Sequence, residues 1–104
     1  MKLSLCASEH VSIALKPFSY ELHGHDVEVE ACWCLEPSRR VDIEDLYKRL
    51  KAALAEYDHR PLWEVLGREG AMIEDMLLSL RGELGEELCR LEARWRGRRI
   101  GLNF

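Results

Sequence analysis

The longest regular pattern in the 104-residue chain is an alternation of apolar and acidic residues between Leu22 and Leu35. The apolar residues Val27, Val29, Ala31 and Trp33 alternate with the acidic residues Asp26, Glu28 and Glu30. Successive side chains of a β-strand point to opposite faces of a sheet, so the pattern predicts a long strand with one apolar face. The turn-forming sequence Glu36-Pro37-Ser38 ends this strand.

Shorter patterns predict the other elements of the chain. The expected elements are a strand at residues 2–10, a loop or broken strand at 11–19, helices at 43–54 and 71–80, and a hairpin of residues 88–95 and 98–104. Asp42 is a suitable N-cap for the first helix, because its carboxylate can accept a hydrogen bond from a free backbone N–H group. Gly97 lies where the hairpin needs a residue suited to a tight turn.

The order strand, strand, helix, helix, strand, strand predicts an α+β fold. We expect a four-stranded antiparallel sheet with two helices on one face, in a single domain over residues 1–104. A sheet of this kind has two open edges, which association with other copies of the chain would cover.

The composition excludes several classes of partner. Nineteen acidic residues against fifteen basic ones leave a net charge of −4, which argues against nucleic acid as the main partner. No apolar run approaches the ~20 residues of a membrane helix, so no membrane partner is expected. The N-terminus becomes polar too early for a signal peptide. Four cysteines without such a signal predict a reducing cytoplasm and free thiols.

Three of the four histidines suggest a metal site. His23 and His25 are separated only by Gly24, and period two places both imidazoles on the same face of the strand. His10 ends the first expected strand, and antiparallel pairing would bring it beside the other two histidines. Three neutral imidazoles with an open fourth position are typical of a catalytic zinc site. The alternative interpretation is a polar strand start that carries two histidines by chance.

These histidines, together with later residues in the same order, resemble the 6-pyruvoyltetrahydropterin synthase family. The family includes the queuosine-pathway 6-carboxytetrahydropterin synthases. The matching residues are His10, His23-Gly24-His25, Val41-Asp42-Ile43, Tyr57-Asp58-His59, Glu74 and Glu92. They span nearly the whole chain.

The resemblance implies a tunnelling fold, in which subunits form an oligomeric barrel from a trimer-based ring or a hexamer. It implies Zn²⁺ held by the three histidines, a pterin site that includes Glu74 and Glu92, and proton transfer by Asp58 and His59. The expected activity is that of a zinc-dependent lyase acting on 7,8-dihydroneopterin triphosphate or a related dihydropterin. Two alternatives stay open from the residues themselves. Glu92 could pair with a neighbouring arginine, and His59 could belong to a polar turn at the end of a helix.

One departure from the family concerns the catalytic residue. The family's catalytic cysteine lies four residues before the first histidine of the His-Gly-His sequence, and Ser19 stands at that position here. A serine hydroxyl is a much weaker acid than a thiol, whose pKa is about 8.5. The second hypothesis is therefore a catalytically silent module that keeps the zinc and a pterin-binding pocket.

Overall fold

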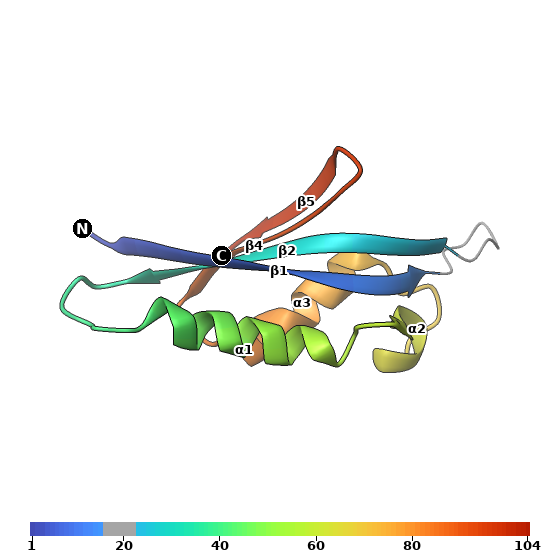
Figure 1. Cartoon of the computed structure of the whole chain (residues 1–104), viewed down its shortest axis with the longest axis horizontal. Helices are drawn as coiled ribbons and strands as arrows, with labels where there is room; N and C mark the ends of the chain where they lie inside the picture. Colours follow the sequence, from blue (N-terminus) through green and yellow to red (C-terminus); the bar gives the residue numbers. More distant parts are fainter. Residues whose placement is uncertain (16–22) are drawn as a thin grey trace.

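A computed structural model describes residues 1–15 and 23–104 of the chain. The elements are β1 (Leu3–Leu15), β2 (His23–Leu35), α1 (Ile43–Ala55), β3 (Arg60–Pro61), α2 (Leu62–Val65), α3 (Ile73–Leu84), β4 (Leu88–Trp95) and β5 (Arg98–Asn103). The helices lie on one face of the sheet (Figure 1), which confirms the α+β class.

The sheet has five strands in the order β3-β1-β2-β4-β5, and it is mixed. β1, β2, β4 and β5 pair with antiparallel neighbours, whereas β3 pairs parallel to β1 at Ile13 and Ala14. The prediction of a four-stranded, purely antiparallel sheet is therefore wrong at this edge. A strand of two residues is too short to show a period in the sequence, so β3 could not be recognised there.

β1 continues through most of the segment that was expected to be a loop or broken strand. Val11, Ile13 and Leu15 are buried, while Ser12 and Ala14 between them are half-buried. The alternation therefore extends to Leu15. β1 and β2 have thirteen residues each and pair over their full lengths.

The helices supply the other half of the core. The Asp42 carboxylate accepts a 2.9 Å hydrogen bond from the backbone N–H of Glu44, which confirms the predicted N-cap of α1. α3 begins two residues after the predicted start and ends at Leu84, and α2 was not predicted. The largest fully buried side chains come from both layers: Trp33, Tyr57, Leu35, Leu50, Leu54, Leu62, Met76, Leu77, Leu80, Leu84, Leu91 and Val27.

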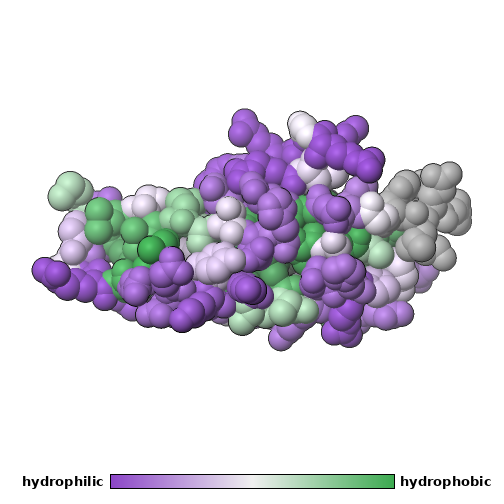
Figure 2. Space-filling model, viewed as in Figure 1, coloured by the Kyte–Doolittle hydropathy of each residue, from purple (hydrophilic) through white to green (hydrophobic). Residues whose placement is uncertain are grey.

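The β4–β5 hairpin extends away from the helices (Figure 1). Its turn consists of Arg96 and Gly97, whose φ angles of 45° and 75° suit a tight two-residue hairpin turn. The molecule is elongated, measuring 50 × 23 × 21 Å. In Figure 2, hydrophilic side chains cover the hairpin, and apolar side chains gather nearer the end that holds the N-terminus. Among the described residues, no helix is long and apolar enough to cross a membrane.

The cysteines form two disulfides, which corrects the prediction of free thiols. Cys6 pairs with Cys32 across β1 and β2, and Cys34 pairs with Cys89 between β2 and β4. The Cα atoms are 4.1 and 5.8 Å apart, respectively. The β1–β2 register places Cys6 directly opposite Cys32, and a register of this kind cannot be deduced from cysteine spacing.

Candidate functional site

Asp58 and His59 follow α1 and lie against the outer edge of β1. The Asp58 Oδ2 atom is 3.0 Å from His59 Nδ1. Asp58 Oδ1 accepts a 2.9 Å hydrogen bond from the backbone N–H of Ser12, and the His59 N–H donates a 2.7 Å hydrogen bond to the Ser12 carbonyl. The two residues are therefore fixed to the sheet through two hydrogen bonds to the backbone of Ser12, and to each other through a third polar contact.

The backbone of His59 has a φ of 59°, in the left-handed region that residues with a side chain rarely adopt. Conformations of this kind persist only where surrounding contacts hold them, and they are concentrated at functional sites. Here the hydrogen bond to the Ser12 carbonyl holds the conformation and directs the imidazole toward Asp58. The structure thus brings together two residues that the sequence predicted to be catalytic.

The Asp58 carboxylate is ionised at neutral pH. The hydrogen bond from the Ser12 backbone, together with a smaller contribution from His59, holds the pKa of Asp58 below its usual range. A carboxylate beside Nδ1 keeps the proton on that nitrogen and leaves Nε2 as an acceptor. The His59 side chain is 79% exposed, so its Nε2 atom is accessible to a substrate.

Ser12 and Asp26 extend this site across the sheet, and sequence reasoning did not single them out. The Ser12 hydroxyl donates a hydrogen bond to Asp26 Oδ1 on β2, where the two residues are directly opposite. We call Ser12, Asp26, Asp58 and His59 the dyad cluster. For Ser12 and Asp26, the only sequence signal was the position of Asp26 directly after His25.

A cavity of about 330 Å³ adjoins the dyad cluster. It is lined by Ser12, Ile13, Gly24, His25, Asp26, Trp95 and Arg96. His25 is half-buried, and its ring centroid lies 6.3 Å from that of Trp95. β4 pairs with β2 only from Glu28 onward. On that side of β2, the earlier residues Gly24, His25 and Asp26 border the cavity.

His10 and His25 do not converge. His10 is directly opposite Glu28, whereas His25 is opposite Ile13, three residues further along β1. Directly opposite residues share a face, and an odd offset along a strand reverses the face. His10 therefore shares a face with Glu28, whose Oε2 atom is 3.5 Å from His10 Nε2, and His25 shares the other face with buried Ile13.

This arrangement does not fit one zinc ion bound by both imidazoles. In the described part of the chain, no group of three or more His, Cys, Asp or Glu side chains could hold a metal ion. The side chain of His23 and the whole of Ser19 lie outside the described residues. Zinc at His10, His23 and His25 stays a prediction.

Glu92 is buried, with 3% of its surface exposed, on the sheet face opposite the helices. It pairs with Arg90 and also with Arg94, whose Nη1 atom is 3.1 Å from Glu92 Oε1. Burial raises the pKa of Glu92, but the hydrogen bonds from the two arginines outweigh this effect and lower it overall. The structure therefore contains the ion pairs between Glu92 and neighbouring arginines that the sequence left open as an alternative.

Glu74 lies half-buried in the first turn of α3, whereas Glu92 and its two arginine partners lie in β4. Its carboxylate is suited to that position, because the positive end of the helix dipole favours a negative charge. Its predicted part in substrate binding stays a prediction, as does that of Glu92.

The architecture defines an α+β protein with a long two-stranded ribbon at the centre of its sheet. No family model matches the chain, and no curated protein matches it either. Among solved structures, it is similar to 6-pyruvoyl tetrahydropterin synthase from Caenorhabditis elegans, with a TM-score of 0.79 and 14% sequence identity. The similarity covers 100% of this chain and 96% of the other. At this identity the similarity shows the fold, which is that of a tetrahydropterin synthase.

Proposed function

We propose that this protein is a pterin-transforming lyase in which Asp58 and His59 together transfer a proton from and back to the substrate. The carrying observation is the 3.0 Å contact between these side chains, held against β1 by the backbone of Ser12. The tetrahydropterin-synthase fold supports a pterin as the class of substrate. We infer 7,8-dihydroneopterin triphosphate or a related dihydropterin.

In the proposed reaction, His59 Nε2 accepts a proton from the side chain of the dihydropterin, and the electron pair left behind expels the leaving group as an anion, which is triphosphate when the substrate is 7,8-dihydroneopterin triphosphate. Asp58 then stabilises the imidazolium through Nδ1, and the same nitrogen Nε2 returns the proton later in the reaction. A base oriented in this way contributes about 10²- to 10⁴-fold to the rate. The proposal also includes Ser19 as a catalytic residue, because it stands at the position of the family's catalytic cysteine.

Glu92 would hold the pterin ring only by exchanging an existing partner. Its carboxylate is buried between Arg90 and Arg94, so a ring N–H donor must replace one guanidinium contact. Glu74 lies in α3, on the other side of the sheet, so it would contribute to the same site from another copy of the chain. These two roles are the part of the proposal that requires the largest rearrangement.

The second candidate function is a silent pterin-binding module of the same fold. Two observations favour it: a serine stands where the family has its cysteine, and His10 and His25 lie on opposite faces of the sheet. Such a module would bind a dihydropterin without converting it.

Incubation with 7,8-dihydroneopterin triphosphate, followed by product analysis and an equilibrium binding measurement, separates the candidates. Turnover supports the lyase. Binding without turnover supports the silent module, and a gain of turnover in Ser19→Cys would then show that only the acid–base group is missing. Neither binding nor turnover contradicts both candidates.

The metal is tested separately, by elemental mass spectrometry of protein purified without added metal. About one zinc per chain would support the prediction for His10, His23 and His25 and would require β1 or β2 to be placed differently from the described structure. A zinc content near zero would contradict that prediction and leave the proton chemistry of the dyad untouched.

The proposal includes a cytoplasmic homo-oligomer, either a trimer-based ring or a hexamer. β3 covers β1 only at Ile13 and Ala14, and in the described residues β5 pairs only with β4. Both outer edges of the sheet therefore offer backbone groups to another copy. A stable monomer in sedimentation velocity would contradict this part.

A further inference from the structure

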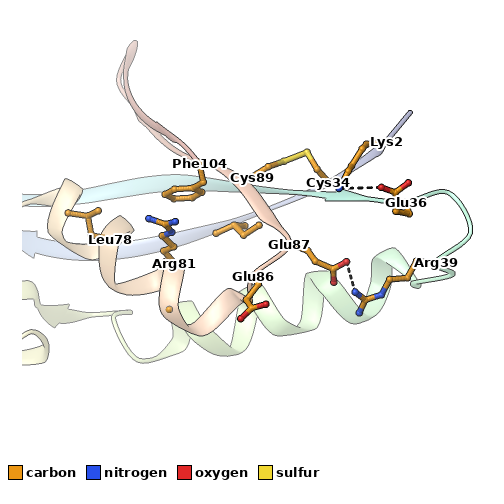
Figure 3. A pocket seen from close by; sticks show the side chains of 13 residues that line it. Lys2, Cys34, Glu36, Arg39, Leu78, Arg81, Glu86, Glu87, Cys89 and Phe104 are labelled. Atoms are coloured by element: carbon orange, nitrogen blue, oxygen red, sulfur yellow. Dashed lines mark ion pairs between the residues drawn. A yellow bond between two sulfur atoms is a disulfide. The ribbon is translucent and has the colours of Figure 1, made fainter.

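A second cavity lies at the opposite end of β2 from the histidines. It has a volume of about 950 Å³, and the disulfide between Cys34 and Cys89 forms part of its wall (Figure 3). Cys34 is one residue from the end of β2, whereas His25 is near its beginning. This cavity is therefore separate from the dyad cluster and does not depend on the proposed pterin chemistry.

The Cys34–Cys89 disulfide is accessible and rigidly supported. Both cysteines are half-buried and line the cavity, whereas Cys32 of the other disulfide is only 6% exposed and does not line it. The Cys34 N–H donates to the Glu87 carbonyl, and the Phe104 N–H donates to the Cys89 carbonyl, both at 3.0 Å. The first contact joins β2 to the residue that precedes β4 independently of the sulfur–sulfur bond, and the second joins β4 to the residue that follows β5.

Three cationic side chains, Lys2, Arg39 and Arg81, line the same cavity as this disulfide. Arg39 pairs with Glu87, and Lys2 lies 3.5 Å from Glu36. The Arg81 guanidinium lies 4.3 Å from the centre of the Phe104 ring, within the range of a cation–π contact.

Phe104 relates Arg81 to the disulfide. Its backbone N–H is hydrogen-bonded to Cys89 and its ring contacts the Arg81 guanidinium, and all three residues line the cavity (Figure 3). Glu86 also lines the cavity, so its walls carry both signs of charge. Of the three cationic side chains, Arg81 is the one whose described partner is an aromatic ring and not a carboxylate.

We propose that this cavity is a thiol–disulfide exchange site for a small acidic thiol. Thiolates are anions, and an arginine suits the carboxylates of such a molecule. The thiolate attacks one sulfur of the Cys34–Cys89 bond, forming a mixed disulfide and releasing the other cysteine as a thiolate. A second thiol molecule then releases the small-molecule disulfide, so two thiols are oxidised and one protein disulfide is reduced.

This site fits the exchange chemistry of a reducing compartment. Cytoplasmic disulfides are usually transient or redox-sensing rather than permanent. Opening the Cys34–Cys89 bond would remove only the covalent link between β2 and β4, because the hydrogen bond from the Cys34 N–H to the Glu87 carbonyl remains. The reaction can therefore proceed without unfolding the sheet.

The test compares glutathione, which carries two carboxylates, with cysteamine, a cationic thiol, at equal thiolate concentrations. Mass spectrometry follows the mixed disulfide in a Cys6→Ala/Cys32→Ala variant, which retains only the Cys34–Cys89 bond. We expect glutathione to react about fivefold faster, and Arg81→Gln to remove this preference, because Arg81 is exposed and an exposed ion pair contributes an effect of about this size.

The converse variant, Cys34→Ala/Cys89→Ala, is the matched control. It retains the Cys6–Cys32 bond, which lies outside the cavity, and its reaction rates should not depend on Arg81. Equal rates for the two thiols at Cys34–Cys89, or a preference that persists in Arg81→Gln, would overturn the proposal. Free thiols at positions 34 and 89 in air-oxidised protein would also overturn it.

Discussion

The two ends of the central β1–β2 ribbon are held together in different ways. At the end that contains Cys6, Cys32 and Cys34, two disulfides join β1, β2 and β4. At the end that contains His25, the additional contacts are polar: the Ser12–Asp26 hydrogen bond and the attachment of Asp58 to β1.

This difference separates covalent stabilisation from the proposed proton transfer along one pair of strands. Covalent links stabilise a fold mainly by constraining the unfolded chain, and they need no titratable group. Hydrogen-bonded carboxylates and imidazoles can instead orient and exchange protons. We therefore expect substitutions of the disulfide cysteines to change unfolding, and those at the dyad cluster to change the turnover of a dihydropterin.

The largest expected effect is on activity at the dyad cluster. Asp58→Asn retains the acceptor oxygen for the Ser12 N–H but removes the charge that stabilises protonated His59, so we expect turnover to fall by about 10²- to 10⁴-fold. Steady-state kinetics measure this loss. Asp45→Asn, at an exposed position in α1, is the matched control and should keep wild-type turnover. Equal turnover in Asp58→Asn and Asp45→Asn would contradict the assignment.

The next largest effect concerns the disulfides. Replacing Cys34 and Cys89 by Ala should lower the free energy of unfolding by about 4 kcal/mol, because this bond closes a long loop. Replacing Cys6 and Cys32 by Ala should cost about 0.7 kcal/mol less, since their sequence separation is 26 residues instead of 55. Urea unfolding under non-reducing conditions measures both values. A larger loss for the shorter loop would show that local packing, not loop length, decides stability here.

A smaller effect is expected for Glu92→Gln, which removes the charge partner of Arg90 and Arg94. We expect a loss of about 2 kcal/mol at pH 7, typical of hydrogen bonds to charged groups. Because the pKa of Glu92 is lowered in the folded state, its stabilisation is present above the unfolded pKa of about 4.3 and is lost as pH falls through the folded value.

Urea unfolding at pH 7 and pH 3 checks the Glu92 prediction. The difference between Glu92→Gln and the unsubstituted protein should shrink at the lower pH. A difference that stays constant over this range would mean that Glu92 contributes through packing rather than through its ion pairs.

The smallest effect is expected for Ser12→Ala. The substitution removes the hydroxyl contact to Asp26 but leaves the backbone groups that hold Asp58 and His59. We expect a loss of about 1 kcal/mol in stability and less than a threefold change in turnover. Thermal unfolding and kinetics measure the two quantities. A loss of turnover comparable with that of Asp58→Asn would show that the Ser12 hydroxyl takes part in the reaction.

Part of the fold could be predicted because its residues show local periods. The alternation around Val27 and Val29 located β2, and the Asp42 cap located the start of α1. β3 has only two residues and shows no period, and the disulfides depend on a register that is set by pairing. Non-local contacts of this kind are not visible in any single stretch of sequence.

The candidate site divides in the same way. Asp58 and His59 could be selected because they are adjacent and resemble a family motif, and the structure holds them together. Ser12 could not be selected, since it holds Asp58 and His59 through its backbone, which every residue type shares. The histidine site was inferred from an expected strand end at His10, but β1 continues to Leu15 and changes the residues that His10 faces.

The most direct test of the contrast between the two ends is a map of backbone amide chemical shifts on addition of a dihydropterin. We predict that the perturbed amides surround the dyad cluster, at Ser12, His25, Asp26, Asp58 and His59, while those at Leu78, Arg81, Cys89 and Phe104 stay unchanged. Perturbations confined to the second group would place the pterin in the disulfide-walled cavity and contradict the assignment of proton chemistry to Asp58 and His59.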